Sequence, residues 1–291
     1  MYKMSNVEKI TIQCQDGYVL SGAFYPATSQ NSQTHPILLC PATGITKKFY
    51  HHFCTWLAQQ GYSVLTFDFR GIGDSLYTHI KHSKASIVQW GQFDIAAGID
   101  KLCELTASEQ IILVGHSAGG QLLGVVPNFD KVKKVIAVAG SSGYVKNLKG
   151  RTKLLAPLMF KGIFPLAKFT IGYGPTKAIG MGENLPKDVA RQWAQFCSHP
   201  GYVLNAIGDS ISKEQDYHHQ IKCPITSLWA PDDEIATEEN VKDFLRIYPN
   251  APTDRIKLTP SDYDHKFIGH MLMFKPSHQN IWPVIESQIH S

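Results

Sequence analysis

The sequence predicts an α/β protein with a mostly parallel sheet covered by helices on both faces. Short apolar runs typical of buried strands alternate along the chain with stretches in which apolar residues recur at helical spacing. Short loops rich in Gly, Asp and Ser follow several of the apolar runs. Because the carboxyl ends of parallel strands meet at one edge of a sheet, we expect the functional site at that edge.

The composition argues against several classes of function. The 291 residues are 43% hydrophobic and 18% charged, with a net charge of +4. No dense Lys/Arg cluster with interleaved aromatic residues is present, so we expect no nucleic-acid partner. No run of about 18 apolar residues is present, so we expect no integral membrane segment. Residues 1–8 lack the apolar core of a signal peptide and the six cysteines show no paired spacing, which favours a cytoplasmic protein with reduced thiols.

Strands and helices are predicted in alternation along the chain. A β-hairpin is expected at residues 10–24, because two alternating runs flank the turn Asp16-Gly17. Gly61 is expected to end the first helix. After the hairpin, the predicted elements are a strand at 36–40, a helix around 49–57, a strand at 62–67, a helix around 95–103, strands at 111–113 and 135–139, a helix from 186, a strand at 224–230, a helix from 237, a strand at 255–259 and a helix around 281–285.

A nucleophile elbow is predicted at residues 115–119, where the sequence reads Gly-His-Ser-Ala-Gly. The apolar run 111–113 precedes it and residues 121–124 can open a helix, which is the strand–turn–helix context that the motif requires. Glycines are needed at both ends of the motif because any side chain would collide with the reversed main chain. Ser117 is therefore the candidate nucleophile, and the backbone N–H of Ala118 is a candidate donor to an oxyanion.

Later parts of the chain supply candidates for the base and the acid that a serine nucleophile needs. Asp232 and Asp233 follow one predicted strand, and His265 and His270 follow the next. A histidine takes the proton of the serine, and a carboxylate holds that histidine in the correct tautomer. No H-E-x-x-H or cysteine–histidine pattern is present, so we expect no metal site.

The chain resembles the α/β-hydrolase fold superfamily, and in particular its bacterial esterase-like and serine-aminopeptidase-like hydrolases, over nearly its whole length. The matching pieces are the loop at 68–75, the elbow at 115–119, the acid after the strand at 225–230, and Gly269-His270. The resemblance implies an α/β-hydrolase fold and hydrolysis of a carboxylic ester, thioester or amide through an acyl-enzyme on Ser117, without a cofactor.

The family pattern also favours one acid and one histidine over their neighbours. Its Gly-x-x-Asp run selects Asp233, because Ala230 stands where that Gly would be, and Asp232 would then be a solvated neighbour. His270 is favoured over His265 because a glycine precedes it and an apolar run follows, as is usual for the histidine of this family.

The loop after residues 37–40 is expected to supply a second oxyanion donor beside Ala118. This sequence has Pro41-Ala42 where His-Gly is common in the family, and Pro41 has no N–H to donate. Thr43 is the favoured donor and Ala42 is the alternative.

Residues 145–215 are predicted to form an inserted lid that divides the hydrolase core into residues 1–144 and 216–291. The segment is longer than a usual connection between core elements. It has no acidic residue before Glu183, and Pro157 is one of the residues that interrupt its apolar runs. We expect the candidate substrate contacts to be His116, Leu158, Phe164 and Trp193. His116 has the alternative role of a packing or hydrogen-bonding residue within the elbow, since its side chain cannot point the same way as that of Ser117.

The mixture of lysines and apolar side chains in this segment allows three interpretations. It would hold an acyl chain with an anionic head group, contact an anionic membrane surface peripherally, or be a solvated rim in which lysines bury only their stems. We predict a carboxylesterase-type serine hydrolase for a small or medium acyl ester. A thioesterase, an acyltransferase or a peptidase would use the same residues, and a binding protein without turnover is the non-enzymatic alternative. The sequence does not indicate the oligomeric state.

Overall fold

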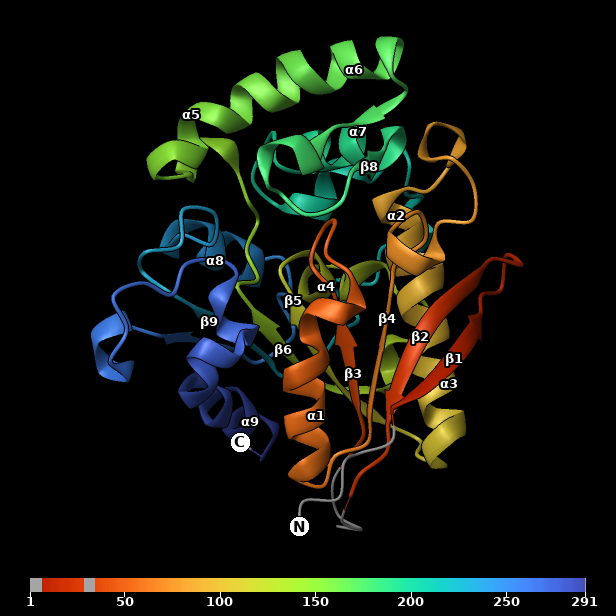
Figure 1. The fold of residues 1–291 in the computed structure, drawn as a ribbon, viewed down its shortest axis with the longest axis vertical. Helices are drawn as coiled ribbons and strands as arrows, with labels where there is room; N and C mark the ends of the chain where they lie inside the picture. Colours follow the sequence, from red (N-terminus) through yellow and green to blue (C-terminus); the bar gives the residue numbers. More distant parts are fainter. Residues whose placement is uncertain (1–6, 29–34, 291) are drawn as a thin grey trace.

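The computed structural model describes residues 7–28 and 35–290, and within them the chain folds around an eight-stranded, mostly parallel sheet (Figure 1). The expectation of no signal peptide was drawn from residues 1–8, and residues 1–6 of this stretch lie outside the described residues. The strand order is β1-β2-β4-β3-β5-β6-β9-β10, in which β1 with β2 and β2 with β4 are antiparallel pairs. The strands are β1 (Glu8–Gln13), β2 (Val19–Tyr25), β3 (Ile37–Cys40), β4 (Val64–Phe67), β5 (Ile111–His116), β6 (Val132–Val138), β9 (Ile225–Trp229) and β10 (Thr253–Lys257).

The predicted hairpin is present as β1 and β2. Gln13 pairs with Val19 across the turn, and Gly17 has a φ of 85°, a conformation that favours glycine over other residues. The remaining predicted strands are present as well, and the sheet that they form is mostly parallel, as expected for the α/β-hydrolase fold that the resemblance implies.

Helices cover both faces of the sheet. The connections β3–α1–β4 and β4–α3–β5 run in opposite directions along the sheet, so right-handed crossovers put α1 and α3 on opposite faces. Phe53 of α1 packs edge-on against Trp282 of α9, which places α9 beside α1. The helices are α1 (His51–Gln59), α2 (Ile87–Gln89), α3 (Ala96–Thr106), α4 (Ala118–Gln121), α5 (Gly150–Leu158), α6 (Phe164–Thr170), α7 (Lys187–Phe196), α8 (Glu238–Leu245) and α9 (Trp282–His290).

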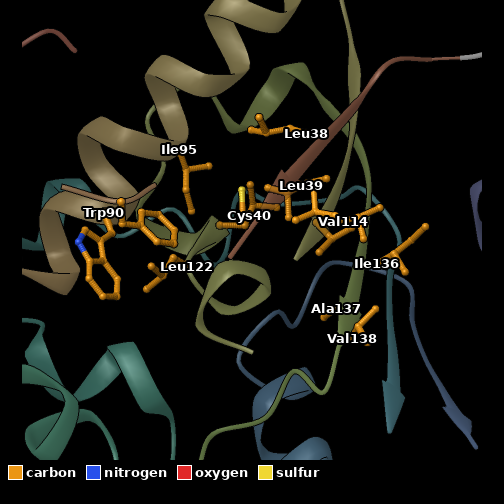
Figure 2. Packing of buried hydrophobic residues seen from close by; sticks show 14 of the residues in the cluster. Leu38, Leu39, Cys40, Trp90, Ile95, Val114, Leu122, Ile136, Ala137 and Val138 are labelled. Carbon is orange, nitrogen blue, oxygen red and sulfur yellow. The ribbon is translucent and has the colours of Figure 1, made fainter. Parts of the chain in front are cut away.

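The core lies on both faces of the central strands β3, β5 and β6 (Figure 2). Leu38, Val114 and Ile136 from these strands are fully buried, which explains why the strands read as short apolar runs without alternation. Figure 2 also shows Trp90 and Ile95, from the segment before α3, packed on this centre.

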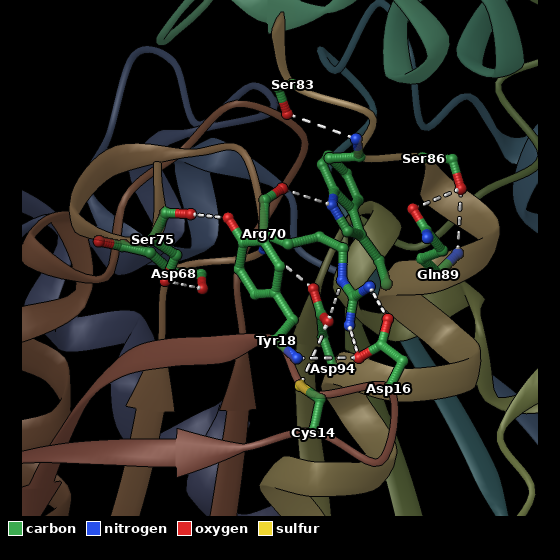
Figure 3. Close-up of polar contacts among 12 residues, drawn as sticks. Cys14, Asp16, Tyr18, Asp68, Arg70, Ser75, Ser83, Ser86, Gln89 and Asp94 are labelled. Carbon is green, nitrogen blue, oxygen red and sulfur yellow. Dashed lines mark hydrogen bonds and ion pairs between the residues drawn. The ribbon is translucent and has the colours of Figure 1, made fainter. Parts of the chain in front are cut away.

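A buried ionic network fixes the hairpin to the loop after β4 (Figure 3). Arg70 is 2% exposed, its Nε lies 2.6 Å from Asp94 Oδ1, and its terminal nitrogens bind the carboxylate of Asp16. In the same loop Asp68 accepts hydrogen bonds from the backbone N–H and the ammonium of Lys47. These carboxylates hold loops at the carboxyl edge of the sheet in place.

The chain between β6 and β9 forms a separate layer above the carboxyl ends of the strands (Figure 1). We call residues 145–215 the inserted segment. It contains α5, α6, α7 and a small sheet of β7 (Tyr173–Gly174) and β8 (Leu185–Pro186). No helix within the described residues is both long and apolar enough to cross a membrane.

Helical structure continues through both prolines of the inserted segment. It runs from Gly150 to Thr170 through a π-helical turn, Met159–Ile163, so Pro157 and Pro165 lie inside the run and each removes one intrahelical N–H donor. One local expectation for a helix is wrong. The helix after the elbow, α4, ends at Gln121 after one turn, and a 3₁₀ turn, Leu123–Val125, follows it.

Candidate active site

Ser117 lies at the sharp turn between β5 and α4, with φ 48° and ψ −120°. A Cβ on Gly115 would lie 2.2 Å from Gly120 Cα, and a Cβ on Gly119 would lie 2.1 Å from the carbonyl oxygen of Cys40. Side chains at both positions are therefore excluded by backbone atoms, as the sequence predicts for a nucleophile elbow. The turn presents Ser117 at the carboxyl edge of the sheet.

Asp233 and His270 meet at the same edge. Asp233 is 1% exposed and its Oδ2 lies 2.7 Å from His270 Nδ1. Its Oδ1 accepts the backbone N–H groups of Ile235 and Ala236. Burial raises the pKa of Asp233, but the attraction of His270 and these hydrogen bonds outweigh burial and hold the pKa below its usual value. The ionised carboxylate therefore keeps the proton of His270 on Nδ1 and leaves Nε2 free to accept one.

Ser117 and His270 line one cavity. No described residue forms a hydrogen bond with Ser117 Oγ, so the serine and the histidine share a cavity wall without a direct bond. Such bonds often tighten only when substrate is bound.

Asp232 does not behave as the sequence-based expectation says. The expectation of a solvated neighbour is wrong, because its two carboxylate oxygens accept the backbone N–H groups of Ile268 (2.8 Å) and Gly269 (3.1 Å). These residues directly precede His270, so Asp232 holds the loop that carries the histidine. His265 lies elsewhere, with its Nε2 2.8 Å from the side-chain oxygen of Asn280.

The loop after β3 offers one free N–H near the serine. The N–H of Ala42, the alternative oxyanion donor, already donates to the Tyr50 hydroxyl at 2.9 Å. The N–H groups of Thr43 and Ala118 have no hydrogen-bond acceptor among the described residues, and Thr43 lines the cavity together with Ser117. Of the two donors considered for this loop, only Thr43 is left available.

His116 is absent from the cavity wall, although the sequence suggested it as a substrate contact. It is fully buried, with Nδ1 2.7 Å from the Tyr50 hydroxyl and Nε2 2.9 Å from the carbonyl oxygen of His270. A carbonyl only accepts, so Nε2 carries the proton and the Tyr50 hydroxyl donates to Nδ1. Burial, with the nearby His270, lowers the pKa of His116 to about 3, so its ring is neutral.

This chain of hydrogen bonds joins three parts of the site that are far apart in sequence. It runs from the N–H of Ala42 through Tyr50 and His116 to the backbone of His270. The loop after β3, the elbow and the loop that carries His270 are thereby fixed to one another. Tyr50 was not identified from the sequence, because nothing in its local pattern indicates a contact 66 residues away.

The cavity at Ser117 has a volume of about 380 Å³ and a largely apolar wall. Leu158 and Trp193, two predicted substrate contacts, line it. Phe164 does not line it but packs beside Trp193, with ring centroids 6.3 Å apart. Among the described lining residues there is no Asp, Glu, Lys or Arg. The cavity therefore suits an uncharged, apolar group better than a charged one.

Besides Ser117, the described cavity wall has a buried hydroxyl without a partner. Ser141, which follows β6, is 1% exposed, and its Oγ has no hydrogen-bond partner among the described residues. It is a polar group in a largely apolar wall.

Glu234 connects the acid loop to the inserted segment. Its carboxylate accepts the N–H of Arg151 at 3.1 Å, and the N–H and hydroxyl of Thr152 at 2.8 and 2.7 Å. These bonds lower the pKa of Glu234 and cap the first turn of α5. Gly150 has a φ of 52°, which favours glycine, and a Cβ there would lie 1.9 Å from Glu234 Oε1 and displace the capping carboxylate.

The part of the chain that the structure describes contains no group of three His, Cys, Asp or Glu side chains arranged to hold a metal ion.

Comparisons with known proteins agree with this geometry. A family model described as serine aminopeptidase, S33, matches residues 32–267. Two Caenorhabditis elegans proteins are similar: lipase lipl-1, 31% identical over 45% of this chain and 33% of its own length, and lipase lipl-3, 27% identical over 63% of this chain and 49% of its own length. The chain thus spans a third to a half of the length of these curated relatives.

Solved structures share the fold at low sequence identity. A chain described as DcsB in complex with its substrate analogue is 14% identical, with a TM-score of 0.64 over 98% of both chains. The esterase PF2001 of Pyrococcus furiosus is 16% identical, with a TM-score of 0.59 over 98% of this chain and 90% of its own. The match of the family model to most of the chain, together with this shared fold, shows that the chain belongs to the serine aminopeptidase, S33, family of α/β-hydrolases.

Proposed function

We propose that the chain is a serine hydrolase that cleaves carboxylic esters of small or medium acyl groups through an acyl-enzyme on Ser117. One observation carries the proposal. Ser117 and His270 line the same cavity, and His270 Nδ1 is bound to the buried, ionised Asp233. This is the arrangement in which a histidine can take the proton of a serine hydroxyl.

The reaction follows from these positions. His270 Nε2 takes the hydroxyl proton while Ser117 Oγ bonds to the acyl carbon, and the N–H groups of Thr43 and Ala118 stabilise the oxyanion. The bond to the leaving alcohol then breaks, and the alcohol departs with the proton from His270. Water repeats the sequence, with its proton passing to His270, and releases the carboxylic acid and the free serine.

The cavity favours an ester over the free amino terminus of a peptide. An aminopeptidase must bind an ammonium group near the bond that it cleaves, and burying an unpaired charge is costly. The described lining residues provide no carboxylate for such a group. An apolar acyl group of up to about the cavity's volume fits the wall formed by Leu158, Trp193 and their neighbours.

We also propose that the inserted segment acts as a lid over this cavity, with residues 1–144 and 216–291 as the core. α5, the following π-helical turn and α7 contribute Leu158, Met159 and Trp193 to the cavity wall. Residues of the inserted segment therefore contact the acyl group while the core carries the reacting groups. The cytoplasmic location stays a prediction from the sequence.

The test combines covalent labelling with a substrate panel. A fluorophosphonate should label the wild-type protein and not Ser117→Ala. On a panel of activated esters, thioesters and aminoacyl amides of increasing chain length, esters should be cleaved with the highest kcat/KM. Ser117→Ala and His270→Ala should each lower kcat by about 10⁴-fold or more, and the double variant little further.

His265→Ala is the matched control, since it removes a histidine from a neighbouring loop that lies outside the cavity. It should retain activity. Absence of label on folded wild-type protein would favour a binding protein, and preferred cleavage of thioesters or amides would replace the ester assignment while leaving the nucleophile in place.

A further inference from the structure

The inserted segment has an apolar face that no described part of the chain covers. Helical structure from Gly150 to Thr170 forms the outermost layer above the sheet (Figure 1). Leu154 is 78% exposed, Leu166 66% and Phe169 83%. An exposed apolar face of this kind marks an interaction site.

The opposite side of the same run is packed against the rest of the inserted segment. Met159, Phe164 and Ala167 are buried, and Phe160 contacts Trp193 of α7 with ring centroids 5.4 Å apart. The inner side of the run therefore provides most of the packing, and the mostly exposed outer leucines and Phe169 contribute little to it.

The exposed face is also basic. Lys153, Lys161 and Lys168 are exposed on the same run, and none of them has an ion-pair partner among the described residues. Residues 145–182 contain no Asp or Glu, and their seven basic residues are Lys146, Lys149, Arg151, Lys153, Lys161, Lys168 and Lys177. Lys149 and Lys177 form ion pairs with Glu239 and Glu183, so the positive charge of this face that is unpaired within the described chain includes that of Lys153, Lys161 and Lys168.

The face continues into the cavity at Ser117. Leu155, Leu158 and Ile179 are each at least half exposed, and each also lines the cavity. Apolar surface thus extends from the outside of the inserted segment to the cavity without a charged side chain among the lining residues.

We propose that this outer face docks on an anionic membrane surface, with the leucines and Phe169 in the headgroup boundary and the lysines at the anionic headgroups. Exposed apolar side chains with flanking lysines on a surface helix have the composition of interfacial helices. A bilayer supplies both an apolar layer and negative charge, whereas a second copy of this chain would oppose basic faces to each other. Docking would place the cavity opening at the lipid surface.

Vesicle sedimentation measures membrane binding and requires no enzymatic turnover. Its result therefore tests the docking proposal independently of the proposed hydrolase function. Wild-type protein should bind vesicles of POPC containing a quarter of POPG, bind pure POPC vesicles much more weakly, and dissociate in half-molar salt. The triple variant Lys153→Gln, Lys161→Gln, Lys168→Gln should bind the anionic vesicles about 100-fold more weakly, at about fivefold for each lysine near the surface.

The matched control removes the same charge from the core. Lys9→Gln, Lys222→Gln and Lys257→Gln, combined in one variant, change three exposed lysines outside the inserted segment and should leave vesicle binding within about threefold of wild type. A second variant, Leu154→Ser with Phe169→Ser, should bind weakly at low salt while keeping the Tm of wild type, because both side chains are exposed.

Three results would overturn the proposal. One is no binding of wild type to either vesicle, and another is equal loss of binding in the two lysine triple variants. The third is a wild-type dimer in lipid-free solution that Leu154→Ser with Phe169→Ser converts to a monomer, which would assign the face to a second copy of the chain.

Discussion

Replacement of Tyr50 by phenylalanine tests whether one hydroxyl holds the active-site loops together. The Tyr50 hydroxyl accepts the N–H of Ala42 and donates to Nδ1 of His116, and all three residues are buried. Tyr50→Phe keeps the ring but leaves a buried donor and a buried acceptor without partners. Since each such group costs about 1–3 kcal/mol, the free energy of unfolding should fall by about 2–6 kcal/mol.

Tyr50→Phe should also reduce catalysis, because the Ala42 N–H and the His116 ring, which lose their hydrogen-bond partner, adjoin the proposed catalytic groups. The N–H of Thr43 follows Ala42 in the chain, and His116 donates to the carbonyl of His270. A small displacement of an oxyanion donor or base weakens the transition state more than substrate binding. We expect kcat to fall by about 10- to 100-fold with KM nearly unchanged, and the rate of fluorophosphonate labelling to fall in parallel.

Tyr25→Phe is the matched control. The Tyr25 hydroxyl also contacts a histidine, with 3.1 Å to His51 Nδ1, but His51 is exposed and reaches water when the hydroxyl is lost. This variant should lose about 0.5–1.5 kcal/mol and retain full kcat. Urea unfolding gives the free energies, and an ester assay well below the Tm gives kcat and KM. Equal stability and equal kcat in the two variants would refute a special role for Tyr50.

Three further predictions follow from the same region. Asp233→Asn should lower kcat by about 10³- to 10⁴-fold by removing the charge that supports His270. Asp232→Asn should lower kcat less and mainly lower the Tm, as measured by calorimetry. The reverse order of the two effects on kcat would exchange the roles of the two carboxylates. The pKa of His116 is about 3 in the folded chain, against 6.5 for a free histidine. Below pH 6.5 the histidine therefore binds a proton in the unfolded chain but stays neutral in the folded chain. Urea unfolding should therefore show a loss of about 2 kcal/mol between pH 7.5 and pH 5 that His116→Gln lacks. Glu234→Ala should speed hydrogen exchange in the first turn of α5, and unchanged exchange there would show that the carboxylate does not cap this helix.

Features that depend on neighbouring residues were predictable from the sequence. The hairpin was predicted from the turn residues Asp16-Gly17. The elbow was predicted from the glycines two residues before and after Ser117, which are required by contacts with nearby backbone. The mostly parallel sheet followed from the alternation of apolar runs and helical spacing, because strands that alternate with helices pair in parallel. The structure brings together Asp233 and His270 as the family pattern suggested, while the part that each takes in catalysis stays a proposal.

Features that depend on contacts between distant parts of the chain were not predictable. The sequence placed His116 beside the nucleophile but gave no sign that its ring bonds to Tyr50 and to the backbone of His270, 154 residues away. Asp232 accepts N–H groups 36 and 37 residues further on, which no local pattern encodes. The helical path through Pro157 and Pro165 depends on a π-helical turn that the sequence does not signal.

The backbone conformation of Ser117 bears on the stability of the fold. A non-glycine residue at φ 48° and ψ −120° is strained by about 1–3 kcal/mol, and glycine would relieve that strain at an entropic cost of about 0.5–1 kcal/mol. Ser117→Gly would thus remove the hydroxyl and still yield a chain as stable as its parent or more so. The stability of the fold alone therefore does not require a serine at this position.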